Sequence, residues 1–207
     1  VIASLQCFVV EELRTARRFL SAAGLRGHID KLELHELNEH TSPAEVEALA
    51  GLFDGGRSVG LLSEAGLPAV ADPGALLVDL CHRHGIRVVP MVGPSSLMLA
   101  LMASGLNGQN FAFKGYLPAK TPERRRALQE LERLSSRLGQ SQIFIETPYR
   151  NDAILADILE CCAPSTRLCI ATNVTAADED IRTKTVEQWK KQKPAIGKRP
   201  TVFILCA

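Results

Sequence analysis

Two apolar runs in the first half of the chain, residues 58–62 and 86–90, each lead into a turn rich in glycine and proline. The first turn is residues 63–74, with the sequence Ser-Glu-Ala-Gly-Leu-Pro-Ala-Val-Ala-Asp-Pro-Gly, and the second is residues 91–96. A helix-like segment follows each turn. This order predicts a βαβ unit, and therefore a parallel sheet with a right-handed crossover. Because ligands of open α/β sheets bind at the carboxyl ends of the strands, both turns are predicted ligand-binding loops.

The composition restricts the classes of protein that this chain can be. With 207 residues, of which 46% are hydrophobic and 23% charged, it can bury a sizeable core without covalent cross-links. The formal net charge is +1, so no overall field favours nucleic acid or a membrane. No run approaches the about 20 apolar residues of a membrane helix, and no signal peptide is visible. We therefore expect a cytoplasmic protein that does not bind a membrane.

The cysteines and histidines have no spacing typical of a metal site. The six cysteines form no CxxC pair, and none of the five histidines stands beside a cysteine at zinc spacing. Cys7, Cys169 and Cys206 lie in apolar, strand-like runs, where a thiol behaves as a small hydrophobic group. We expect reduced cysteines and no metal. Nucleophilic hydrolysis has little support either, because no Gly-x-Ser-x-Gly elbow is present.

The pattern of elements changes near residues 90–96 and predicts two α/β domains, residues 1–92 and 93–207. A small-molecule cleft is expected between the two domains, because domain seams are preferred places for such sites. Alternating or continuous apolar runs predict the further strands, and Ser95 is expected to start a helix that is buried between layers. These expected strands are residues 7–10, 31–37, 110–116, 142–146, 167–172, 181–186 and 201–205, the last of the central-sheet type.

Polar residues follow two of the strand-like runs in the second half. Residues 146–151, Glu-Thr-Pro-Tyr-Arg-Asn, place an acid, an aromatic ring and a cation where a plain connector would do, and residues 171–175 are similar. The alternative is purely structural, with Thr147 as a helix cap. The same alternative stands for the other turns, with Asp72 and Ser95 as caps.

Basic residues form two clusters, and both have two interpretations. The first cluster is Lys120 with residues 124–126, and the second lies at residues 190–199. Such clusters can contact phosphates, but a run of charge is more often a solvated face. The clusters are therefore interpreted either as a local patch that faces RNA or as solvated surface.

The 63–74 turn, then Arg87-Val-Val-Pro90, Gly93-Pro94 and Ala103-Ser-Gly-Leu106, occur in the order seen in the tetrapyrrole methylase superfamily of S-adenosylmethionine-dependent enzymes. The chain most resembles the ribosomal RNA small-subunit methyltransferase I family, through residues 113–120 and the arginines that follow. The resemblance covers nearly the whole chain. It implies two α/β domains with the cofactor in the cleft between them, a homodimer, and methylation of a cytidine ribose 2′-oxygen in the 16S rRNA of the 30S subunit.

The resemblance also implies which residues contact S-adenosylmethionine. In the first domain these are Ala65, Gly66 and Leu67, through their backbone, and Val70. In the second domain they are Ser95, Ser96, Glu146, Thr147, Val174, Pro200 and Thr201. Methyl transfer depends chiefly on alignment of the reacting atoms, but a ribose hydroxyl would benefit from a nearby base or cation. Glu146 and Lys120 are the candidate catalytic residues, with Lys114 as a further candidate.

Two features differ from the family pattern. The family opens with a strand and a Pro/Gly loop, whereas this chain begins in what resembles the end of the first helix, so we expect an N-terminal domain without its first strand. Tyr149 stands where the family motif Glu-Ser-x-His-Arg has histidine. Two alternatives stay open, namely a methyltransferase acting on a tetrapyrrole or other small molecule, and a non-catalytic α/β binding module.

Overall fold

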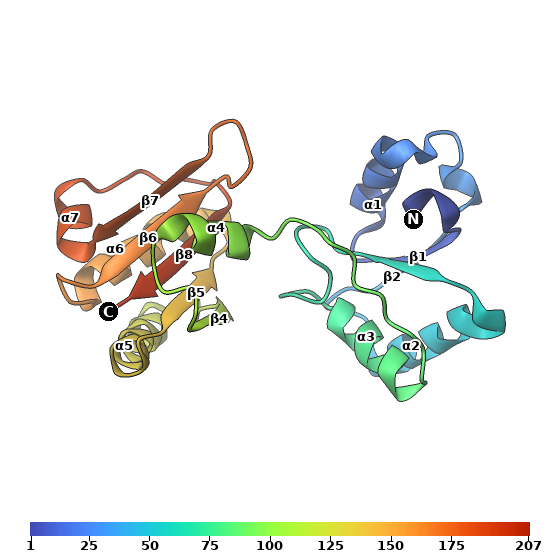
Figure 1. Ribbon diagram of the computed structural model, residues 1–207, viewed down its shortest axis with the longest axis horizontal. Coiled ribbons are helices and arrows are strands. Elements are labelled where there is room, and N and C mark those ends of the chain that lie inside the picture. The colour runs from blue at the N-terminus through green and yellow to red at the C-terminus, as the bar shows by residue number, and fades with distance from the viewer. The chain divides into compact units, whose positions relative to one another are not determined.

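The computed structural model describes residues 1–207, which divide into two compact units, Val1–Pro94 and Ser95–Ala207. Each unit is an α/β unit with its own sheet, as predicted (Figure 1). The Ser95 side chain caps the first helix of the second unit by accepting a hydrogen bond from the N–H of Met98.

The N-terminal unit contains a three-stranded parallel sheet. Strand β1 (Cys7–Val10) lies in the centre, between β2 (Glu33–Glu36) and β3 (Val59–Leu62), and pairs in parallel with both. The helices are α1 (Leu13–Leu20), α2 (Pro43–Ala48) and α3 (Gly74–Arg83), with the short helical segments η1 (Ile2–Ser4), η2 (Ser21–Leu25), η3 (Ile29–Lys31) and η4 (Leu49–Gly56). The sheet is therefore parallel, but its parallel pairs are β1 with β2 and β1 with β3, and not the predicted pair of residues 58–62 with residues 86–90.

Alternation along β1 separates two hydrophobic clusters, one on each face of the sheet. Val9 packs in a cluster with residues of α2 and α3, whereas Phe8 and Val10 pack with residues of α1. Gly60 lies opposite Phe8 in the register of β3 with β1. A Cβ atom at Gly60 would lie 2.5 Å from the Phe8 ring, so close packing of the ring on β3 requires glycine there.

The expected strand at residues 86–90 is wrong. The sheet of this unit ends at β3, and residues 86–90 take no part in its ladder. Ile86 and Val88 do pack against the cluster of α2 and α3, while Val89 is 59% exposed. An extended segment that rests one face on a core has the same period-two pattern as a strand, although it lacks the interstrand hydrogen bonds that define one.

The C-terminal unit contains a five-stranded mixed sheet. Its order is β4 (Phe111–Tyr116), β5 (Ser141–Ile145), β8 (Thr201–Cys206), β6 (Arg167–Thr172) and β7 (Asp180–Thr185). The pair β4 and β5 is parallel and the other pairs are antiparallel. The last strand lies in the centre, as its continuous apolar sequence predicted.

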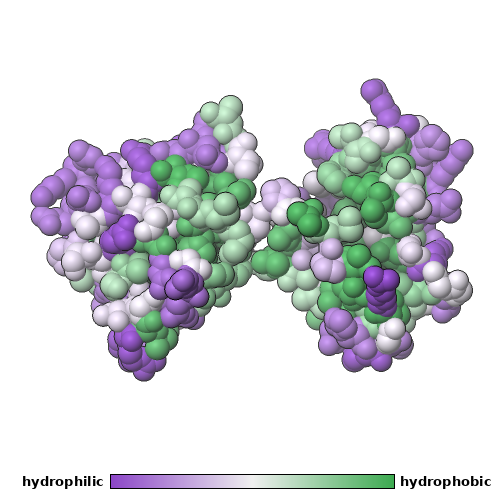
Figure 2. All heavy atoms as spheres, viewed as in Figure 1, coloured by the Kyte–Doolittle hydropathy of each residue, from purple (hydrophilic) through white to green (hydrophobic).

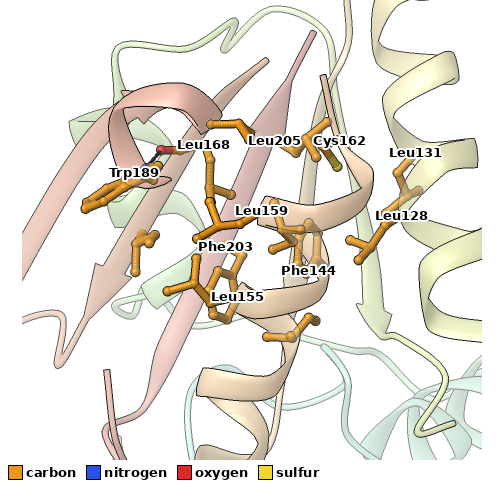
Figure 3. Close-up of a cluster of buried hydrophobic side chains, with 14 of the residues drawn as sticks. Leu128, Leu131, Phe144, Leu155, Leu159, Cys162, Leu168, Trp189, Phe203 and Leu205 are labelled. Atoms are coloured by element: carbon orange, nitrogen blue, oxygen red, sulfur yellow. Dashed lines mark hydrogen bonds between the residues drawn. The ribbon is translucent and has the colours of Figure 1, made fainter. Parts of the chain in front are cut away.

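Helices cover both faces of this sheet. Along β8, Val202 and Ile204 pack against α4 (Ser96–Ser104), and the alternate residues Phe203 and Leu205 pack on the other face. That second face is covered by α5 (Thr121–Leu138), α6 (Asn151–Cys161) and α7 (Val186–Lys191), and the short helix η5 (Pro148–Arg150) precedes α6. Figure 3 shows this larger cluster, in which the indole N–H of Trp189 donates to the Leu168 carbonyl at 2.9 Å.

Two simpler expectations can be compared with the structure. All six cysteines are free thiols, and four of them are buried. None of the helices combines the length and the apolar character required to span a bilayer.

Candidate functional site

The loop at residues 63–74 joins the carboxyl end of β3 to α3 and has a strained backbone. Gly66, Ala69 and Ala71 have φ angles of 80°, 65° and 56°. Glycine adopts this left-handed region freely, but an alanine in it costs about 1–2 kcal/mol. Strain of this kind persists only where surrounding contacts enforce it, and it is concentrated in ligand-binding and catalytic segments.

Asp72 supplies contacts that hold this loop. Its Oδ1 accepts hydrogen bonds from the N–H groups of Ala69 at 3.0 Å and Gly74 at 2.7 Å. A Cβ atom at Gly74 would lie 2.6 Å from the same oxygen, so the contact requires glycine at that position. Asp72 therefore stabilises the turn from within, while Pro73 is the capping residue of α3. The other oxygen, Oδ2, is buried and has no hydrogen-bond partner.

Glu11 holds the beginning of the same loop, and the sequence reasoning missed it. Its Oε2 accepts a hydrogen bond from the N–H of Glu64 at 2.8 Å, and the Ser63 hydroxyl lies 3.3 Å from the same oxygen. Burial raises the pKa of the Glu11 carboxyl and the adjacent Asp72 carboxyl raises it further, against the opposing effect of the Glu64 N–H. Glu11 could have been predicted from its position, because it directly follows the carboxyl end of the central parallel strand β1.

The predicted cofactor residues of the N-terminal unit lie together on this loop. Ala65 and Gly66 are exposed, Leu67 is half-buried, and Val70 is 42% exposed. The two turns that the sequence singled out also meet, because a Cβ atom at Gly93 would lie 3.1 Å from the Leu67 side chain. This part of the unit therefore has small residues and a partly exposed valine at its surface.

In the C-terminal unit, Glu146 directly follows β5 and is 4% exposed. Its Oε1 accepts hydrogen bonds from the N–H of Thr147 at 2.7 Å and from the Arg150 guanidinium, whose Nη2 is 2.5 Å away. Arg150 also lies over the ring of Tyr149, with 5.7 Å between the guanidinium carbon and the ring centroid. Only Oε2 of Glu146 remains without a partner, and it is buried.

Asn151 is a second site residue that the sequence reasoning named only as part of a turn. Its side-chain amide is buried and donates to the carbonyls of Gly197 at 3.1 Å and Arg199 at 2.7 Å. This fixes the start of α6 to the segment before β8, where the predicted residues Pro200 and Thr201 lie. The amide oxygen of Asn151 is buried without a partner. Glu146 and Asn151 thus each keep one buried oxygen without a hydrogen-bond donor, which is uncommon in a folded protein.

The turn after β6 contains the predicted residue Val174 between two strained residues. Asn173 and Thr175 have φ angles of 48° and 75°, and the latter value is a true outlier for a β-branched residue. The N–H of Asn173 donates to the Pro200 carbonyl at 2.9 Å, so this turn is fixed to the start of β8. The structure therefore brings three of the predicted segments of this unit together, residues 146–151, 173–175 and 200–201.

Val174 also lines a hollow of about 360 Å³ on the C-terminal unit. The other residues around it are Leu99, Met102, Ala103, Thr175, Glu179 and Ile181. Hydrophobic side chains show on this unit's surface in Figure 2, and Met102 of α4 is 79% exposed. The expectation that α4 is buried between layers is therefore wrong for one face, because its buried residues Leu97, Ala100 and Leu101 lie on the other.

The basic cluster at residues 124–126 is largely structural. Arg124 is 4% exposed and its Nε donates to Asp157 at 2.7 Å, while Arg125 donates to the same carboxylate and to Glu160. Of the three arginines, only Arg126 is exposed. Arg124 precedes the buried Leu128 by four residues, which is about one helical turn. The 3.6-residue period of a helix could therefore have predicted that Arg124 lies on the buried face. Lys120, a candidate catalytic residue, is exposed and lies 3.9 Å from Glu123, and Lys114 is also exposed.

One group of potential metal ligands was not visible in the sequence. Cys7, Glu33 and His35 bring their ligand atoms within 4.8 Å of one another on adjacent strands. The Arg57 guanidinium, however, lies 2.8 Å from Glu33 and 3.7 Å from the Cys7 sulfur. Burial raises the pKa of the Cys7 thiol, which disfavours the thiolate that a metal requires. Glu33 is therefore paired with Arg57 and His35, and these contacts favour an ion-paired cluster over a metal site.

Comparison of the sequence with known proteins identifies the family of this chain. Residues 1–190 match the family model described as Tetrapyrrole (Corrin/Porphyrin) Methylases. A curated relative from Escherichia coli O157:H7, named ribosomal RNA small subunit methyltransferase I, is 31% identical over 99% of this chain and 70% of its own length. A protein of the same name from Neisseria meningitidis serogroup B is 34% identical over 90% of this chain and 61% of its own length. The chain spans about three fifths of the length of the first curated relatives that it matches.

Solved structures agree on the fold. The methyltransferase CobJ aligns with a TM-score of 0.61 and 16% identity, covering 99% of this chain and 84% of that chain. Uroporphyrin-III C-methyltransferase from Thermus thermophilus, solved in complex with S-adenosylhomocysteine, aligns with a TM-score of 0.51 and 15% identity, covering 97% of each chain. At these identities the likeness establishes the fold alone.

Proposed function

This chain belongs to the tetrapyrrole (corrin/porphyrin) methylase family, and on that premise we propose that it acts in S-adenosylmethionine-dependent methyl transfer. The observation that carries the proposal is the 63–74 loop, whose alanines are held in a left-handed backbone at the carboxyl end of a parallel strand. A turn that served only as a connector would not require such strain, whereas a loop shaped around a ligand would. The solved relative with bound S-adenosylhomocysteine supports the choice of ligand.

In the N-terminal unit, Ala65, Gly66 and Leu67 are proposed to approach the cofactor with their backbone groups, and Val70 to pack against it. The exposure of Ala65 and Gly66 and the open space around Gly66 support this assignment. Small residues matter because they let a ligand lie directly on the main chain.

In the C-terminal unit, the proposed cofactor residues are Ser95, Ser96, Glu146, Thr147, Val174, Pro200 and Thr201. The buried acceptor oxygens of Glu146 and Asn151 fit a ligand that carries amino and hydroxyl donors, as S-adenosylmethionine does. Ser95 already caps α4, so its neighbour Ser96, which is exposed, is the freer of the two hydroxyls.

The cofactor would supply an activated methyl group on a sulfonium, and the residues of this chain would position both partners of the transfer. Glu146 is proposed to accept a hydrogen bond or proton through Oε2, while Arg150 keeps the carboxylate in place through Oε1. Lys120 is proposed to contact the substrate, since its side chain is exposed.

We propose RNA as the substrate, a ribose 2′-oxygen of 16S rRNA in the 30S subunit as the methyl acceptor, and a cytoplasmic homodimer as the working form. The names of the curated relatives support a ribosomal RNA substrate. One observation favours a second candidate, a tetrapyrrole or other small molecule. Arg124 and Arg125 are paired with acids of α6 and are not available to phosphates.

Calorimetric titration with S-adenosylmethionine and S-adenosylhomocysteine tests the cofactor. We expect micromolar binding, and its loss in Gly66→Val. The matched control is Gly55→Val, because Gly55 has a similar left-handed φ angle of 70° and no atom near its Cβ position, but lies outside the loop. Equal binding by both variants would contradict the placement, and no binding by the unmodified chain would favour the non-catalytic module.

Methylation of 30S subunits separates the two substrates. Arg126→Glu is expected to weaken RNA methylation without changing cofactor affinity, and Arg137→Glu in the last turn of the same helix serves as the control, because it is also exposed. If charge reversal at Arg126 has no effect on transfer to RNA, the small-molecule substrate gains support.

A further inference from the structure

Two carboxyl groups, those of Glu11 and Asp72, each hold a different part of the 63–74 loop. Glu11 accepts the N–H of Glu64 at the beginning of the loop at 2.8 Å. Asp72 accepts the N–H groups of Ala69 and Gly74 at its end at 3.0 and 2.7 Å. The left-handed Ala69 is itself held by Asp72, and the left-handed Ala71 lies between the anchored residues Ala69 and Gly74.

The two carboxyl groups also act on each other. The Asp72 carboxyl is close enough to raise the pKa of the Glu11 carboxyl. The Oδ2 of Asp72 is buried without a hydrogen-bond partner. Two carboxylates in contact repel each other, and a buried carboxylate oxygen without a donor is costly. A single proton between the two groups removes both problems.

We propose that Glu11 and Asp72 share one proton, and that the resulting hydrogen bond between a Glu11 oxygen and Asp72 Oδ2 holds the 63–74 loop in its cofactor-binding conformation. Both are positioning residues, because they act on the cofactor through the loop backbone. The link to the cofactor rests on the function proposed above, whereas the shared proton rests on the geometry of the N-terminal unit.

No Lys, Arg or His nitrogen forms an ion pair within 4.0 Å of Glu11 or Asp72. The groups that act on its carboxyl are the N–H of Glu64, the Ser63 hydroxyl and Asp72. The neighbouring Glu12 is engaged elsewhere, because its carboxylate accepts the N–H groups of Arg14 and Thr15 at the start of α1. The Glu64 side chain is exposed.

The stability of the folded chain is expected to depend on pH because the pKa of Glu11 is raised. Burial is the largest cause of this increase, and the Asp72 carboxyl adds to it. The folded chain then binds this proton more tightly than the unfolded chain does. Its contribution to stability is fully present below the ordinary pKa of 4.5 and is lost as the pH rises through the raised value. Cofactor affinity is expected to fall in the same direction.

Amide variants can replace the shared proton with a permanent donor. In Glu11→Gln, the amide group can donate to Asp72 Oδ2 while its oxygen still accepts the N–H of Glu64. In Asp72→Asn, the oxygen keeps the bonds to Ala69 and Gly74 and the new amide donates to Glu11. Glu64→Gln is the matched control, because it removes an exposed carboxylate of the same loop that has no part in the pair.

The experiment measures S-adenosylhomocysteine affinity by calorimetry from about pH 5 to about pH 9. For the unmodified chain and Glu64→Gln, Kd is expected to rise with pH by up to about tenfold per pH unit, because one proton is bound together with the ligand. For Glu11→Gln and Asp72→Asn, Kd is expected to stay nearly constant. Measurable binding with a flat profile for the unmodified chain would overturn the proposal.

A second readout separates this proposal from the proposed function. Amide hydrogen exchange of Glu64, Ala69 and Gly74, corrected for intrinsic rates, reports the loop without any ligand. If the chain does not bind S-adenosylhomocysteine but these amides lose protection as the pH rises, the proton pair stands and the cofactor proposal fails. If the amide variants do not fold, the NMR titration of the Glu11 carboxyl in the unmodified chain decides. A pKa above 4.5 supports the pair, and an unshifted pKa overturns it.

Discussion

The guanidinium of Arg124 and the carboxylate of Asp157 form a buried ion pair that joins α5 to α6. Both side chains are 5% exposed, and the second oxygen of Asp157 accepts a hydrogen bond from Arg125 at 2.7 Å. Removal of one partner from such a pair leaves an uncompensated buried charge, which costs about 3–5 kcal/mol.

Asp157→Ala is accordingly expected to lower the free energy of unfolding by about 3–5 kcal/mol, as measured by urea denaturation. Glu160→Gln is the control, because Glu160 pairs with the exposed end of Arg125 and is itself exposed. The control should change stability much less. Equal effects of the two substitutions would mean that the buried pair does not tie the helices together.

Gly60→Ala should lower the free energy of unfolding by about 1–3 kcal/mol, because the added methyl group overlaps the Phe8 ring on the neighbouring strand. Gly51→Ala provides the comparison. Its Cβ atom would meet only Asp54, at 4.0 Å, so this variant should be close to neutral. Thermal or chemical unfolding of the two variants measures the difference, and a neutral Gly60→Ala would show that β1 and β3 pack less closely than described.

Ala71→Gly is expected to increase stability and reduce cofactor affinity. Glycine removes about 1–2 kcal/mol of left-handed strain at φ 56°, and the greater freedom of the unfolded chain offsets about 0.5–1 kcal/mol of that gain. The affinity for S-adenosylhomocysteine should fall because the loop is less preorganised.

The control for that substitution is Ala75→Gly in the first turn of α3, where the same change should lower stability by about 0.5–1 kcal/mol. Opposite signs for the two variants in unfolding experiments support the strain at Ala71. If both variants are destabilised alike, the strain is not stored at that residue.

Asn151→Ala should lower the free energy of unfolding by about 1–3 kcal/mol, because the carbonyls of Gly197 and Arg199 lose a buried donor. The affinity for S-adenosylhomocysteine should decrease as well, since the segment before β8 is no longer fixed. Asn107→Ala removes an exposed amide that also donates to a carbonyl, at 2.6 Å to Gly139, and should have a smaller effect on stability and none on affinity.

Much of the fold was predictable because it follows from local periodicity. The central position of β8, which its continuous apolar sequence indicates, and the cap at Ser95 both follow from residues close together in the sequence. The same holds for the 63–74 loop, whose glycines and prolines identified it as a turn at the end of a strand. Its motif, in order with those that follow, identified the family that the comparisons confirmed.

What the sequence could not determine depends on contacts between distant residues. The apolar run at residues 86–90 predicted a strand, but strand formation requires a hydrogen-bonding partner, and no local pattern encodes one. Arg124 and Arg125 looked like a free basic patch until the packing of α6 against α5 placed Asp157 and Glu160 beside them.

The sequence by itself determined most of the elements, their order and the turns at the ends of the strands, because these depend on local periodicity and turn residues. The tertiary structure decided which polar groups in and around those loops act together. Glu11 holds the N–H of Glu64 at the start of the loop, and Asn151 holds the segment before β8, only because folding brings these side chains beside backbone groups that are distant in the sequence.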